Sequence, residues 1–153
     1  MTLPDDAGSI DIRGANQLDV DFLILADGAQ VQNKKLFLLG GGWTFIRVQT
    51  FPATHPMSAA LGILIPWLKT NERHKFRVEI RNEDTKTVAV GVEGEFEQGR
   101  PPGTPAGMTQ RVMMAFNFGL QIDAPAQFIA EASVNGIALK TLPFRAVAAA
   151  QRP

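Results

Sequence analysis

The chain has 153 residues, 45% of them hydrophobic, which is enough for one domain with a substantial core and excludes disorder throughout. Its 15 basic and 15 acidic residues balance without forming a basic block, so we expect neither a nucleic-acid partner nor a membrane surface as partner. The absence of cysteine excludes disulfides, thiolate metal sites and a cysteine nucleophile. With an acidic N-terminus and no apolar leader, the sequence predicts a cytoplasmic protein.

The change of composition along the chain predicts an N-terminal arm, one folded domain and a C-terminal tail. Residues 1–18 are polar, contain Pro4 and Gly8, and are expected to form a flexible arm. Residues 19–147 carry the apolar patterning of a single β-sandwich domain. Residues 148–153 form a tail, and the Ala-rich stretch from Val147 to Pro153 fits a short helix or disorder equally well.

Apolar residues recur with a period of two over most of the domain. Successive side chains of a strand point to opposite faces, so each apolar row predicts a strand with one buried face and one wetted face. The clearest rows are Phe76, Val78 and Ile80; Val88, Val90, Val92, Gly94 and Phe96; Met114, Phe116, Phe118, Leu120 and Ile122; and Phe128, Ala130, Ala132 and Val134.

Turn-forming residues separate these rows at short intervals. Asn135-Gly136 is typical of a two-residue hairpin, and turns are also expected at 26–28, 32–34 and 82–86. The pattern predicts an all-β fold, an antiparallel two-sheet sandwich of immunoglobulin-like or jelly-roll-like type. About nine strands are expected, at 20–26, 35–39, 43–49, 59–66, 75–82, 87–97, 111–122, 126–134 and 138–146.

The segment 57–68 fits two kinds of element. Met57, Leu61, Leu64 and Leu68 follow helical spacing, with a proline before them at a favourable first position. Pro66, however, would lack a donor inside such a helix, and apolar residues also alternate from 59 to 65. The sequence favours a strand here and leaves a helix as the alternative.

The hairpin of 75–82 with 87–97 has a predicted register. If paired residue numbers sum to 170, Val78 meets Val92 and Ile80 meets Val90 on the buried face. On the exposed face, Arg77 meets Glu93 and Lys75 meets Glu95. A shift of two residues would instead put Glu79 opposite Glu93, a like-charge pair that destabilises.

The two histidines are the first candidates for chemistry. His55 is expected in a proline-flanked loop, and His74 just before the strand that begins at Lys75. A histidine pair can bind a metal or exchange protons, together with a carboxylate such as Asp27. Neither histidine has a second ligand at a local motif spacing, so the sequence assigns no catalytic residue, no metal ligand and no cofactor.

Two further features have simple structural explanations. Glu93, Glu95 and Glu97 share one strand face and could hold Ca²⁺, but the matching basic row on 75–81 indicates charge pairing across the hairpin. The run Gly40-Gly41-Gly42 lacks the spacing of a phosphate-binding loop and predicts a bulge or positive-φ connection.

The longest irregular segment, 98–107, contains three prolines and is therefore stiff before any partner arrives. It can serve as a recognition loop or as a rigid crossover between sheets. We take residues of this segment, with three candidates from outside it, as the predicted binding surface: Trp67, Arg100, Pro101, Pro102, His55 and His74.

Several segments resemble a family of small bacterial β domains of unknown function. They are Leu25-Ala26-Asp27-Gly28-Ala29, Leu38-Leu39-Gly40-Gly41-Gly42-Trp43, His55-Pro56, Pro66-Trp67 with Asn71 and His74, Gly94-Glu95-Phe96, Gly99-Arg100-Pro101-Pro102-Gly103 and Leu142-Pro143-Phe144. The resemblance covers about 22–145 and departs at Asn33-Lys34, where Asn-Gly is expected. It implies a compact β domain with a strand at 59–66, and it implies no activity.

We therefore expect a non-enzymatic binding or interaction module whose partner is another protein or a second copy of itself. Two alternatives stay open. One is a small-molecule-binding domain or enzyme that uses His55, His74 and carboxylates. The other is a structural homo-oligomer joined through an exposed strand.

Overall fold

The computed structural model describes residues 16–149, and the predicted arm and tail lie mostly outside this range. Within it the chain forms nine strands and one short 3-10 helix, η1. The elements are β1 (Asp19–Gln32), β2 (Lys35–Gly41), β3 (Phe45–Val48), β4 (Ala53–Ile65), η1 (Trp67–Lys69), β5 (Arg73–Asn82), β6 (Thr87–Glu97), β7 (Gln110–Ile122), β8 (Ala126–Val134) and β9 (Ile137–Ala148). No helix among these residues is long and apolar enough to span a bilayer.

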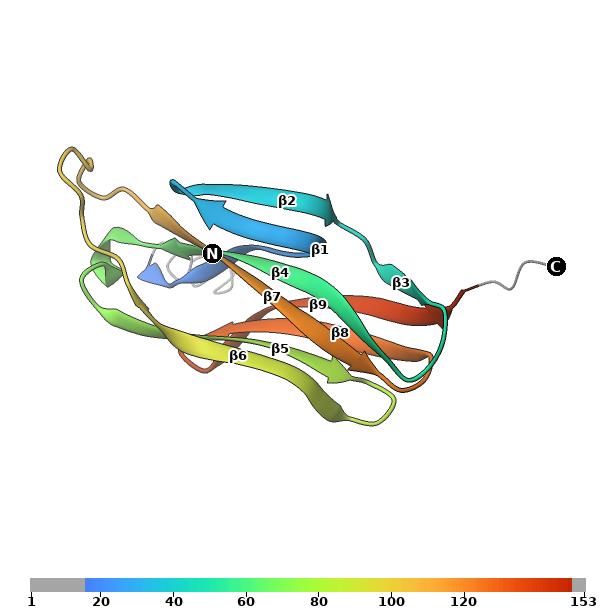
Figure 1. Cartoon of the computed structure of the whole chain (residues 1–153). Helices are drawn as coiled ribbons and strands as arrows, with labels where there is room; N and C mark the ends of the chain where they lie inside the picture. Colours follow the sequence, from blue (N-terminus) through green and yellow to red (C-terminus); the bar gives the residue numbers. More distant parts are fainter. Residues whose placement is uncertain (1–15, 150–153) are drawn as a thin grey trace, which may run out of the picture.

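The strands form two stacked sheets, which confirms the predicted all-β sandwich (Figure 1). One sheet has the order β2-β1-β4-β7 and the other the order β3-β9-β8-β5-β6. All neighbouring strands are antiparallel except β3 and β9, whose parallel pairing the sequence did not predict. Inward side chains from both sheets build the core, in which the rings of Phe128 and Phe144 stack with centroids 5.3 Å apart.

The predicted register of the β5–β6 hairpin is confirmed. Val78 lies opposite Val92, and Arg77 lies opposite Glu93, with 3.1 Å between Nη1 and Oε2. Glu95 lies opposite Lys75 as expected, although its ion pair is with Arg73.

One residue of the predicted inner row of β6 is misplaced. The register shifts at a bulge between Ile80 and Arg81, so that Val88 lies opposite Arg81. Val88 is 51% exposed. A single extra residue in one strand moves the side chains beyond it to the opposite face of the sheet. The apolar row in the sequence does not show where such a bulge falls.

β1 folds back on itself. Its first half pairs with β4 as far as Ala26, which lies opposite Ser58. Beyond that point the N–H and C=O of Ala29 bond to the side-chain amide of Asn117 on β7, the residue that lies opposite Ser58 on the other side of β4. The β1–β2 hairpin therefore covers part of the outer face of β4, and Figure 1 shows it above that strand. Ser58 and Ala60 are consequently buried although they face outward.

The turn predicted at 26–28 lies at this reversal. Residues 26–28 lie inside β1, so the expected break between two strands is wrong. The chain does change direction there, as Figure 1 shows. Asp27 leans across the β1–β2 pair onto Gly40, which has φ +60° and no side chain in the way. The left-handed backbone conformation at position 40 favours glycine, and the Asp27 carboxylate occupies the space that a Cβ would fill there.

The remaining differences concern strand ends and turns. Residues 57–65 are strand, as favoured, and η1 begins only after Pro66. β4 starts six residues before the predicted 59, because the ladder to β7 continues through Pro56 to Ala53. β9 reaches Ala148, one residue past the predicted end of the domain, since β3 pairs with its last residues. Both two-residue turns have φ positive at both positions, including Asn33-Lys34, so that lysine occupies the site expected to be glycine.

Candidate functional site

The structure brings two of the predicted binding residues together. The Arg100 guanidinium lies over the Trp67 ring, with 3.7 Å from Cζ to the ring centroid. Its Nη2 donates to the Trp67 carbonyl oxygen at 2.8 Å and its Nε to Thr70 Oγ1 at 2.7 Å. Arginine has donors in a planar fork and a face that stacks on aromatic rings, and this site uses both properties. Arg100 is therefore an anchor that fixes the loop between β6 and β7 to η1.

Further hydrogen bonds fix the same loop, residues 98–109, which we call the Pro-rich loop. The Asn71 N–H donates to the Gln98 carbonyl oxygen at 2.8 Å, and Gln98 Nε2 donates to Gln110 Oε1 at 3.0 Å. Two tight turns follow, closed by the amides of Thr104 and Met108. The loop is thus ordered by its own contacts, and a ligand would not have to order it on binding.

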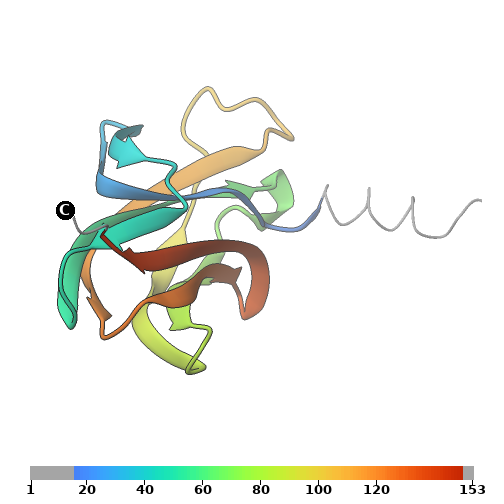
Figure 2. The same cartoon turned by 90° about the vertical axis from the view of Figure 1, so that its right-hand side faces the viewer.

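A groove of about 530 Å³ lies between the Pro-rich loop, the start of β7 and the turn of the β1–β2 hairpin. Figure 2 shows the hairpin and the loop rising on the same side of the sandwich, with β7 beneath them. The apolar lining consists of Val31, Leu64, Pro101, Met108, Val112 and Met113. The polar lining consists of Lys34, Gln98, Thr109, Gln110 and Arg111. Arg111 is held by Asp21, with 2.6 Å between Nε and Oδ2, while Lys34 is an exposed residue on the rim of the groove.

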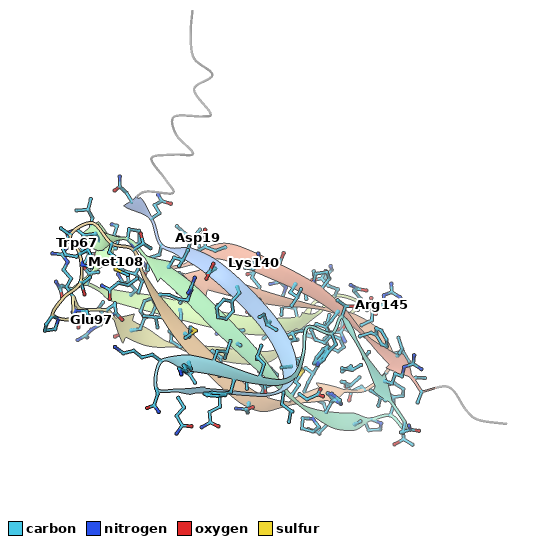
Figure 3. The ribbon with its side chains drawn as sticks, turned by 90° about the horizontal axis from the view of Figure 1, so that it is seen from above. Asp19, Trp67, Glu97, Met108, Lys140 and Arg145 are labelled. Atoms are coloured by element: carbon cyan, nitrogen blue, oxygen red, sulfur yellow. The ribbon has the colours of Figure 1, made fainter. Side chains whose placement is uncertain are left out.

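Of the predicted residues, Pro101 lines this groove, and Trp67 and Arg100 support its loop. Pro102 is exposed on the same loop. Met108 and Met113 were not predicted, since nothing in the sequence shows that β1 folds back to form the opposite wall. Figure 3 shows Met108 and Trp67 at the same end of the molecule.

His74 has a structural role. It lies inside β5, not before it, and its side chain is buried. Asn135 Oδ1 accepts from the Lys75 N–H, so its Nδ2 donates to His74 Nδ1, and His74 Nε2 donates to the Lys69 carbonyl oxygen at 2.8 Å. Both ring nitrogens are used to tie η1 and the β8–β9 turn to β5.

His55 lies far from His74 and from the groove. The prediction of a loop is wrong, because His55 is a half-buried residue of β4 opposite Leu120. The groove and η1, which His74 contacts, lie at the end of β4 that contains Leu64 and Ile65. His55 lies ten positions before Ile65, which corresponds to about 33 Å along an extended strand. Its Nε2 has no hydrogen-bond partner among the described residues. The two histidines do not form a joint site.

The carboxylate row of β6 lies on the outer face of its sheet beside basic side chains. Glu93 pairs with Arg77 and Glu95 with Arg73, as charge pairing across the hairpin requires. Within residues 16–149, no three histidine, aspartate or glutamate side chains lie close enough together to hold a metal ion. The outer face of this sheet is a network of ion pairs centred on Glu79 and Arg81.

The model of a family of unknown function (DUF6941) matches residues 21–147, nearly the whole sandwich. The chain belongs to this family. Membership in DUF6941 confirms the resemblance seen in the sequence and assigns no activity, so any role must come from the site itself. No curated protein matches the sequence. The cytoplasmic location expected from composition stays a prediction.

Proposed function

We propose that this protein is a non-enzymatic interaction module that binds an extended segment of another protein in the groove beside the Pro-rich loop. The observation that carries the proposal is the Arg100 anchor. It holds one wall of the groove in place before a partner arrives, so that less conformational entropy is lost on binding.

The lining supports a protein segment as ligand. Methionine side chains adapt to partners of different shape, and Met108 is 49% exposed while Met113 is half-buried. Thr109 adds a hydroxyl among the apolar walls that can bond to a peptide backbone, whereas the amides of Gln98 and Gln110 already bond to each other and to the Gly99 carbonyl oxygen. Lys34 on the rim favours a segment with an acidic residue next to its apolar anchor.

The test is a selection of binding segments from a displayed peptide library on the wild-type protein, followed by affinity measurements with the purified segments. Met108→Glu places a carboxylate on the apolar wall and is expected to weaken binding at least tenfold, the order of a lost apolar anchor. Val88→Glu is the matched control, since Val88 is similarly exposed but lies on β6. Segments that bind Met108→Glu as tightly as wild type would overturn the proposal.

A further inference from the structure

The free edge of β2 is a second surface, distinct from the groove. β2 is the last strand of its sheet, so it has a strand neighbour on one side only. Phe37, Leu38 and Leu39 follow one another there and are 55%, 39% and 74% exposed. Edge strands are usually protected by charges, prolines or bulges, and the run 36–39 contains neither a charge nor a proline.

The hairpin register shows which backbone groups are free. Gln32 and Lys35 flank a two-residue turn and therefore exchange hydrogen bonds, as do Gln30 and Phe37 two residues further on. The N–H and C=O of Leu38 must then point away from β1. Its partner Ala29 bears this out, because its own N–H and C=O point away from β2 to the Asn117 side chain.

The charges beside this edge are arranged with opposite signs at its two ends. Lys34 and Lys35 lie at the start of β2, and the Asp27 carboxylate lies over Gly40 near its end. All three side chains are exposed. Two copies placed antiparallel would bring the cationic end of each strand beside the anionic end of the other, whereas a parallel arrangement would bring like charges together.

We propose that two copies of this chain associate through β2, paired antiparallel about a two-fold axis. With Phe37 opposite Phe37 of the second copy, Leu36 of each copy lies opposite Leu38 of the other. These two residues then exchange backbone hydrogen bonds across the interface. This register stops short of Gly40, whose φ of +60° is not extended. The paired hairpins form a four-stranded sheet, and its solvent face gathers Phe37 and Leu39 from both copies.

Sedimentation velocity of the full chain across a micromolar-to-millimolar range tests the association. Wild type should be a dimer that dissociates on dilution, and Leu39→Lys should be a monomer at every concentration. Leu39 is exposed on the solvent face of the hairpin, so its replacement leaves the fold intact. Val88→Lys on β6 is the matched control and should dimerise like wild type. A monomeric wild type, or a Leu39→Lys protein that still dimerises, would overturn the proposal.

Charge exchange tests the antiparallel arrangement separately. Asp27→Lys and Lys35→Glu should each weaken self-association about tenfold by turning two attractions into two repulsions. An equimolar mixture of the two variants should recover wild-type affinity, because both contacts of the mixed dimer are again attractive. A mixture no tighter than the single variants would contradict this pairing. Since neither Leu39 nor Asp27 lines the groove, segment binding there should be unchanged in these variants, which separates the two proposals.

Discussion

Replacement of Arg100 by methionine tests whether the Pro-rich loop is anchored as described. Methionine keeps an unbranched apolar stem but removes the guanidinium over Trp67 and the hydrogen bonds to the Trp67 carbonyl and Thr70 Oγ1. An exposed cation–π contact contributes about 0.5–1 kcal/mol, and we take about 0.5 kcal/mol for each hydrogen bond, the low end of net values, because Arg100 itself is an exposed residue. Thr70 stays satisfied, because its hydroxyl donates to the Trp67 carbonyl oxygen. The expected loss is about 1.5–2 kcal/mol.

Urea unfolding followed by tryptophan fluorescence measures this loss, and hydrogen exchange locates it. The amides of Thr104 and Met108, which close the two turns of the loop, should exchange faster in Arg100→Met. Arg100→Lys, which keeps a charge without the fork, should lose about half as much free energy. Arg47→Met is the control, since Arg47 lies over Phe45 at the longer distance of 5.4 Å and should cost less than about 0.5 kcal/mol. Equal losses of unfolding free energy in Arg100→Met and Arg47→Met would refute the anchoring role of Arg100.

Three further changes test the fold around the groove. Asn117→Ala removes the amide that holds the folded-back half of β1, and should cost about 1–3 kcal/mol in urea unfolding and speed exchange of the Ala29 amide. Lys34→Gly should raise the free energy of unfolding by about 0.5–1 kcal/mol, because φ is +60° there; an unchanged midpoint would contradict the turn assignment. The Arg81 guanidinium, aided by Arg77, holds the pKa of Glu79 below its ordinary range despite burial. Its stabilisation is therefore present above the ordinary pKa of about 4.3 and lost as the pH falls through the lower folded value, and Glu79→Gln should flatten this acid-side loss in unfolding titrations.

The apolar rows with a period of two and the turn-forming residues between them were sufficient to predict most of the fold. The register of β5 and β6 followed from Val78, Arg77 and Glu93 because core and charge favour the same pairing. The dipeptide Asn135-Gly136 was sufficient to predict a hairpin, because both residues tolerate the positive φ that a two-residue turn needs. These features depend on residues close together in the sequence.

The groove depends on contacts between distant parts of the chain. Asp27 and Gly28 indicated a turn in the sequence. That the hairpin then covers β4 could not be predicted, because this arrangement depends on Asn117, about ninety residues later in the chain. The loop 98–107 was recognised by its prolines, whereas its fixed position depends on Trp67 across a long separation. His74 was singled out for chemistry, and only its partners show that both ring nitrogens are occupied.

The proposed function requires that a protein segment binds in the groove beside the Pro-rich loop. Amide chemical shifts of the isotope-labelled protein, recorded during titration with a selected segment, test it most directly. The largest changes should fall at four residues that line the groove: Lys34, Met108, Arg111 and Met113. Changes confined to the ion-paired face of β5 and β6, with the groove amides unmoved, would contradict it.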